Sequence, residues 1–416
     1  MGGLGGYVPA LDDSGQMARP LVVVDLDSGV ERPAVERAVA SARASGQLLV
    51  GVASGELPAW PSPLVETLDL TLAASGEGPG CVAVSDPEAE VAALSKAVAD
   101  NPQASLVLGQ VLRITEGLPV PAALEVESLA YSTLLGGREF GRWLDGRDDR
   151  PLPPPVTEPV AVRRDGERMF ITLNRPERRN AYGRQLRDAL TDALRVALLD
   201  PAITWTVLDG AGPCFCSGGD LAEFGTAPDL ATAHFIRTRA GAAPFMHDLR
   251  DRIEVRMHGS CVGAGVELAA FAGAVTAAEG TTFRLPEVGM GLIPGAGGTV
   301  SVPRRIGRWR TLYLALTGRA IDTSTALDWG LIDSALLLPG DPEFVTGIFR
   351  QALVGVSGVV LLVPVPLSLA VNEILVPALV RPVKHCRTRD ARAGGCRQRD
   401  WSGDGEGADR RRGEHA

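Results

Sequence analysis

The chain has 416 residues, enough for two domains, and its 45% hydrophobic and 22% charged residues are the balance of a globular protein. A formal net charge of −9 argues against nucleic acid as the main partner. The six cysteines show no CxxC or zinc-ligand spacing, and Met1–Gly6 has neither part of a signal peptide. We therefore expect a cytoplasmic protein with reduced cysteines and no metal site.

The first third of the chain alternates strand and helix patterns. Residues 1–19 are rich in glycine, and we predict them to be disordered. Within residues 20–145, apolar β-prone runs at Leu21–Leu26 and Gln47–Ala53 flank a helical pattern at Ala34–Ala44. This alternation predicts an α/β region.

The end of that region is helical in pattern. Asp86 is a suitable N-cap before Pro87. The expected helices are Asp86–Ala99, Pro102–Val111, Ala122–Leu135 and Arg138–Leu144. Residues 146–159 are charged and then rich in proline, which predicts an extended linker.

After the linker, apolar runs are repeatedly followed by glycine-containing turns. We expect a strand at Val255–Met257 and then, in Gly259–Ala270, a glycine-rich turn that begins at Gly259 and a helix from Glu267 onward. Such a turn presents free main-chain N–H groups at a helix N-terminus, where an enolate or thioester oxyanion would be stabilised. The alternative is a small-residue turn that only lets the helix pack closely on a sheet.

Three other stretches accompany this one: Leu173–Ala181, Pro213–Leu221 and Phe283–Thr299. In this order and spacing, the four resemble the crotonase superfamily, also called the enoyl-CoA hydratase/isomerase family. The resemblance covers about Val160–Asp333. It implies an α/β fold whose core, residues 160–350, is a crotonase-like ββα spiral. The preceding region is then either a degenerate crotonase-like half or an unrelated α/β domain.

The resemblance also implies a reaction. The family binds acyl-CoA thioesters and stabilises an enolate with two main-chain N–H groups, which fall here on Gly219 and Ala264. Glu267 and Glu287 occupy the hydratase positions: Glu287 would protonate the α-carbon, and Glu267 would orient or activate water. Gly295 would help place that water. For either glutamate alone, a structural role is the alternative.

Coenzyme A would enter as part of the substrate, and no separate cofactor is implied. Arg178 and Arg179 could reach its pyrophosphate, or could be solvated surface charges. The resemblance adds Ala181, Ser217 and Asp220 to the CoA-binding residues.

Several reactions remain open. We expect an enoyl-CoA hydratase of fatty acid metabolism that forms a homo-oligomer, a trimer or a dimer of trimers. The alternatives are isomerisation, decarboxylation or thioester hydrolysis on the same enolate, or an inactive module that keeps the fold.

The resemblance ends near residue 350. Residues 351–383 are apolar and atypical; Leu353–Val371 has the length of a membrane span, but Pro364 and Pro366 interrupt it, so we predict no membrane contact. Residues 384–416 are predicted to be disordered. Because Ala122–Leu144 resembles the family's closing helices, we expect it to cover the core in their place.

Overall fold

A computed structural model describes residues 11–13, 15, 17–27, 32–56, 62–76, 78, 80–148 and 151–336, which all belong to one compact unit. The predictions for residues 1–10 and for everything after residue 336, including the apolar stretch and the disordered tail, lie outside the described residues. No helix among the described residues is long and apolar enough to cross a bilayer.

The N-terminal region contains a four-stranded parallel sheet in which the strands lie in sequence order. The predicted alternation is observed, because one helix follows each of the first two strands. The elements are β1 (Leu21–Asp25), α1 (Arg32–Arg43), β2 (Leu48–Glu56), α2 (Ser62–Thr67), β3 (Leu70–Ser75) and β4 (Cys81–Ala83).

Four helices follow: α3 (Pro87–Asp100), α4 (Pro102–Thr115), α5 (Val120–Leu135) and α6 (Arg138–Asp145). Asp86 caps α3 as predicted, since its Oδ1 accepts the N–H of Ala89 at 3.0 Å. The buried Glu139 of α6 accepts the N–H groups of Gln103 and Ala104 at 2.7 and 2.9 Å. A carboxylate from α6 therefore caps α4 and fixes the two helices together.

The second part is built on a six-stranded sheet in the order β12-β10-β8-β7-β6-β5, parallel except for the β5–β6 hairpin. Helix α7 packs on this hairpin because Leu186, Leu190 and Leu194 recur at helical spacing and are buried. The elements so far are β5 (Val160–Asp165), β6 (Arg168–Leu173), α7 (Arg184–Leu199), β7 (Trp205–Gly210), β8 (Ile253–Met257), β10 (Ala274–Ala278) and β12 (Ser334–Leu336).

The remaining elements lie in the connections between these strands. They are α8 (Leu230–Ala240), α9 (Ala243–Asp248), β9 (Ser260–Val262), α10 (Ala264–Ala269), β11 (Thr282–Arg284), α11 (Gly298–Thr317) and α12 (Thr323–Trp329), with 3-10 turns at Pro176–Arg178, Leu221–Glu223, Arg250–Arg252 and Glu287–Met290. Strands β9 and β11 pair in parallel as a separate small sheet.

Two expectations about these elements were wrong. The expected turn before Glu267 contains β9, because Gly259 and Gly263 both have positive φ and bracket a short segment that pairs with β11. Helix α10 begins at Ala264, since the Gly263 carbonyl already accepts the N–H groups of Val266 and Glu267. Helix α11 begins at Gly298, and its backbone is broken at Gly307 (φ 82°).

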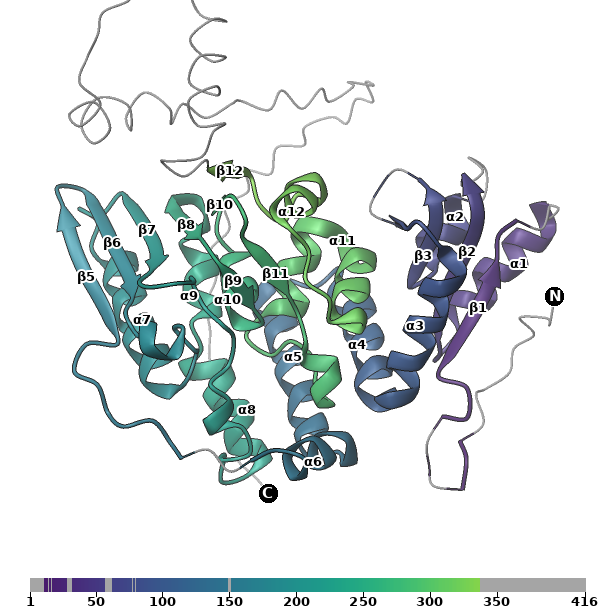
Figure 1. Cartoon of the computed structure of the whole chain (residues 1–416), viewed down its shortest axis with the longest axis horizontal. Coiled ribbons are helices and arrows are strands. Elements are labelled where there is room, and N and C mark those ends of the chain that lie inside the picture. The colour runs from purple at the N-terminus through teal and green to yellow at the C-terminus, as the bar shows by residue number, and fades with distance from the viewer. Residues whose placement is uncertain are drawn as a thin grey trace, which may run out of the picture. The chain divides into compact units, whose positions relative to one another are not determined.

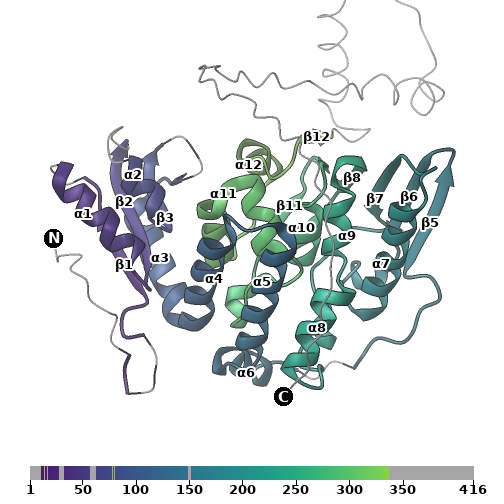
Figure 2. The ribbon, with the colours of Figure 1, turned by 180° about the vertical axis from the view of Figure 1, so that it is seen from behind.

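The N-terminal helices pack directly on the second part. Helix α4 lies against α11, and α5 contacts α11, α8 and α9 (Figures 1 and 2). One continuous cluster of buried hydrophobic residues runs from Leu48 through Phe140 to Ile332. The helices predicted to close the core from the N-terminal side therefore share its hydrophobic core.

A buried ion cluster reinforces this contact. Asp69, 2% exposed, accepts the N–H of Leu49 at 2.8 Å and pairs with Arg113 of α4 at 3.0 Å. Arg308 of α11 lies 3.8 Å from the same carboxylate. Burial raises the pKa of Asp69, and the two arginines oppose the rise. The cluster thus joins the N-terminal sheet, α4 and α11.

A fragment that begins near Val156 should therefore be insoluble or inactive. Removing residues 1–150 exposes the apolar faces of α11 and α8 that α4 and α5 cover, and large exposed apolar patches drive aggregation. Solubility after expression and the thermal unfolding midpoint check this. A soluble, cooperatively folding fragment would show that the N-terminal region is an independent appendage.

Candidate functional site

A cavity of about 830 Å³ lies between the N-terminal helices and the second part of the chain. Six predicted site residues line it: Gly219, Asp220, Ala264, Glu267, Glu287 and Gly295. The other four predicted residues, Arg178, Arg179, Ala181 and Ser217, are not among its lining residues. The structure thus brings the predicted catalytic residues together and leaves most of the predicted CoA contacts outside.

Two main-chain donors have no acceptor in the part of the chain that the structure describes. Gly219 follows Gly218, whose positive φ (94°) turns the chain and whose carbonyl accepts the N–H of Tyr182 at 2.7 Å. Ala264 is the first residue of α10, so its N–H has no partner within the helix. Among the described residues, neither the Gly219 nor the Ala264 N–H has a hydrogen-bond acceptor.

Glu267 is held by the loop that precedes α11. It is the fourth residue of α10 and 2% exposed. Its Oε2 accepts the N–H groups of Ala296 and Gly298 at 2.7 and 2.9 Å. A Cβ at residue 298 would lie 2.8 Å from that oxygen, which explains a glycine there.

Glu287 accepts fewer hydrogen bonds from the protein than Glu267 does. It is 8% exposed and opens the 3-10 turn after Pro286. Its Oε2 is buried with no hydrogen-bond partner among the described residues, and its Oε1 lies so close to Gly263 that a Cβ there would collide with it. A buried oxygen without a donor favours the protonated carboxyl group.

A third glutamate, Glu127 of α5, reaches the same loop from the N-terminal region. It is 2% exposed; Oε1 accepts the N–H of Gly297 at 2.8 Å, and Oε2 accepts the N–H and Oγ1–H of Thr299 at 2.9 and 2.7 Å. Sequence reasoning missed it. Its only signal was a single acidic residue on the apolar face of a helix.

Burial raises the pKa of all three carboxyl groups. That of Glu287 rises to about 8, and that of Glu127 to about 7, where hydrogen bonds from Thr299 and Gly297 oppose the rise. The pKa of Glu267 is raised by burial and then by the charges of Glu287 and Glu127. At neutral pH the cluster therefore keeps at least one proton. Among the described residues, no cluster of His, Cys, Asp and Glu side chains has the arrangement of a metal site.

The predicted CoA residues have other partners. Arg178 forms a two-bond ion pair with the buried Asp220, at 2.6 and 3.0 Å, and Asp220 also caps the following 3-10 turn. Arg179 is exposed in a left-handed conformation (φ 53°). These contacts show a structural role for the Arg178–Asp220 pair. CoA binding by Arg178, Arg179, Ala181, Ser217 and Asp220 stays a prediction.

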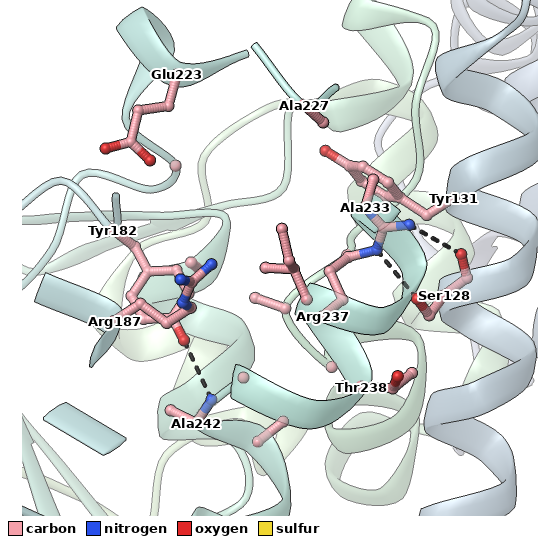
Figure 3. Close-up of a pocket in the computed structure, with 18 of the residues that line it drawn as sticks. Ser128, Tyr131, Tyr182, Arg187, Glu223, Ala227, Ala233, Arg237, Thr238 and Ala242 are labelled. Atoms are coloured by element: carbon pink, nitrogen blue, oxygen red, sulfur yellow. Dashed lines mark hydrogen bonds between the residues drawn. The ribbon is translucent and has the colours of Figure 1, made fainter. Parts of the chain in front are cut away.

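The remaining wall of the cavity was not predicted. In Figure 3, Tyr182 and Arg187 lie on one side, and Ser128, Tyr131 and Arg237 lie on the other. The Tyr182 hydroxyl accepts the N–H of Ala242 at 3.2 Å, while Arg237 donates to Ser128. Ser128 and Tyr131 come from α5, so the N-terminal region contributes part of the cavity wall.

Comparisons with known proteins now identify the family. Residues 167–339 match the model of the family described as Enoyl-CoA hydratase/isomerase. A Mycobacterium tuberculosis protein named probable enoyl-CoA hydratase is 33% identical over 186 residues, which cover 44% of this chain and 70% of the relative. The chain belongs to the enoyl-CoA hydratase/isomerase family.

Other relatives differ in their reactions. The 1,2-epoxyphenylacetyl-CoA isomerase of Escherichia coli is 33% identical over 204 residues (44% of this chain, 78% of the relative), and the 2,3-dehydroadipyl-CoA hydratase of the same organism is 32% identical over 182 residues (44% and 70%). The structure of an enoyl-CoA hydratase/isomerase from Marinobacter aquaeolei is 27% identical with a TM-score of 0.41, covering 47% of this chain and 76% of its own.

These findings confirm the predicted membership and fold class: a crotonase-like α/β core, preceded by a smaller α/β region. The family match contains Glu267 and Glu287 but excludes Glu127. Whether the N-terminal region is a degenerate crotonase-like half stays a hypothesis.

Replacing Glu127 with alanine should destabilise the protein by about 2–4 kcal/mol, because three buried donors lose their acceptor. Chemical denaturation measures this. Glu125→Ala is the matched control, since Glu125 is exposed on the same helix and should change stability by less than about 0.5 kcal/mol. Equal effects of the two variants would contradict the capping role of Glu127.

Proposed function

We propose that the protein is an enoyl-CoA hydratase, which adds water across the 2,3 double bond of an acyl-CoA thioester. The observation that carries the proposal is the pair Glu267 and Glu287, buried in one cavity with the N–H groups of Gly219 and Ala264, which have no acceptor among the described residues. Family membership supports an acyl-CoA substrate, and the reaction itself is our inference.

The two N–H groups would bind the thioester oxygen. When water adds at carbon 3, the electron pair of the double bond moves into the thioester and leaves negative charge on that oxygen. Main-chain donors suit this task because they are rigid and do not titrate. Losing one such donor typically costs about 100- to 1000-fold in rate.

The glutamates would divide the proton transfers. Two N–H donors stabilise the ionised form of Glu267, so it accepts the proton of the attacking water. Glu287, whose Oε2 has no donor, keeps its proton and gives it to carbon 2 of the enolate. The proton then on Glu267 must return to Glu287, directly or through water, before the next turnover.

Gly295 borders the cavity beside this pair, and we propose that its N–H helps place the water. Coenzyme A would be bound as part of the substrate, with no other cofactor. The cytoplasmic location and the homo-oligomer remain predictions.

Isomerisation of the double bond is the second candidate. The Escherichia coli isomerase is as similar to this chain as the hydratases are. An isomerase needs a single carboxyl group to move one proton between carbons. The two reactions differ in their products, so product analysis after incubation with crotonyl-CoA and with a 3-enoyl-CoA distinguishes them.

Glu287→Gln and Glu267→Gln should each lower the rate of hydration about 100-fold or more, since each removes a general acid or base from a nearly unchanged shape. Loss of the enoyl thioester absorbance of crotonyl-CoA measures the rate. Because Glu287 must be protonated, wild-type kcat/KM should fall as the pH rises through about 8. Near-wild-type turnover in either variant would remove the hydratase assignment.

Gly219→Pro should lower kcat about 100-fold or more relative to Gly219→Ala, because proline lacks the N–H donor. The alanine variant is the matched control: a Cβ at this position meets the Phe224 ring at 2.7 Å in both variants, so their difference reports the donor. Circular dichroism checks folding. If the two variants have equal rates, the Gly219 N–H does not bind the oxyanion.

A further inference from the structure

Arg237 of α8 is a partly buried cation on the cavity wall. Its Nε and Nη2 donate to the hydroxyl and the carbonyl of Ser128, each at 3.1 Å, and Nη2 also donates to the Ser132 hydroxyl. Among the described residues, Nη1 has no acceptor, and no carboxylate lies within ion-pair distance of the guanidinium. The charge of Glu127 acts on Arg237 only from beyond ion-pair distance.

Arg237 shares the lack of a close carboxylate with the partly buried Arg147, Arg252 and Arg310, but of these four it is the one that lines the cavity. Arg113, Arg178 and Arg308 all pair with a carboxylate, as buried charges in proteins generally do. Burial lowers the pKa of Arg237, and an arginine nonetheless keeps its charge. A cation that faces a cavity in this state is suited to an anion in the ligand.

The position of Arg237 indicates which part of a ligand it would meet. The Arg237 guanidinium carbon lies 4.6 Å from the centroid of the Tyr131 ring, and that ring packs against Gly295, beside the loop that holds Glu267. Tyr182, which bonds to the Gly218 carbonyl, lies on the other side in Figure 3. Arg237 therefore lies on the side of the cavity formed by Tyr131 and the loop that holds Glu267, opposite Tyr182.

We propose that Arg237 binds a carboxylate at the far end of the acyl chain, so that the substrate is an ω-carboxy-2-enoyl-CoA. The inference rests on the proposed function, which places the thioester at Gly219 and Ala264. The Tyr131 hydroxyl, which also lines the cavity and has no hydrogen-bond partner among the described residues, supplies a second donor. Burial raises the pKa of Tyr131, so this hydroxyl stays protonated.

Arg237 also joins α8 to α5 through Ser128 and Ser132, so a loss of activity alone would not separate binding from packing. The preference of the enzyme between two substrates of equal length, measured as a ratio of kcat/KM values, separates a lost anion site from a packing defect. A packing defect changes the rates of both substrates alike, whereas a lost anion site affects only the carboxylate.

The experiment compares 2-enoyl-CoA thioesters of four to eight carbons that end in a methyl group or a carboxylate. For at least one length, the wild type should favour the carboxylate in kcat/KM by about tenfold or more. Arg237→Met should lower kcat/KM for that substrate about 10- to 100-fold, as expected for a charge-assisted hydrogen bond, and change the methyl substrate less than about threefold. Arg237→Lys should retain part of the preference.

Arg304→Met is the matched control. Arg304 also bridges two segments, donating to the carbonyls of Val300 and Leu118, but it does not line the cavity. Its replacement should leave the preference for the carboxylate unchanged.

Binding measurements separate the failure of this proposal from the failure of the hydratase assignment. Calorimetry with saturated acyl-CoA and ω-carboxyacyl-CoA needs no turnover; a carboxylate preference there without hydration would refute the reaction and keep the anion site. No preference in the wild type, or equal losses for both substrates in Arg237→Met, overturns the proposal. If Arg237→Met weakens binding of CoA alone by the same factor, the anion is a CoA phosphate, and the proposal is wrong.

Discussion

The loop at the start of α11 is the constraint on which the site depends. Its successive main-chain N–H groups alternate between two carboxylates: those of residues 296 and 298 bond to Glu267, and those of residues 297 and 299 bond to Glu127. Glycines at 297 and 298 permit this arrangement, since one has positive φ and the other leaves no room for a side chain. The two carboxylates also stabilise the helix N-terminus that they cap.

Because of this arrangement, charged groups from both parts of the chain determine the electrostatics of the cavity. Glu267 comes from the family core and Glu127 from α5, and the charge of Glu127 raises the pKa of both Glu267 and Glu287 because the three carboxyl groups share one buried volume. Glu287 shares that volume without sharing the loop donors. In the proposed mechanism, the division into one ionised and one protonated carboxyl group therefore depends on which oxygens the loop reaches.

The sequence predicted the parts that depend on local pattern. Asp86 indicated the N-terminal cap of α3, and the family motifs indicated Glu267 and Glu287, which do lie together. It could not predict contacts between distant segments. Glu127 is 170 residues from Gly297, and Arg237 meets α5 across 109 residues, so no spacing rule relates them. Strand β9 was missed because three residues between glycines carry no periodic signal.

The shared hydrophobic core also has a consequence for synthesis. Helices α4 to α6 leave the ribosome before the second part of the chain that packs on them, and α11 emerges last among the main contacts of α4 and α5. At about 5–20 residues per second, the wait is on the order of ten seconds or more. During that time the apolar faces of α4 and α5 are uncovered, so the nascent chain passes through a stage in which chaperones have a binding surface that the finished protein lacks.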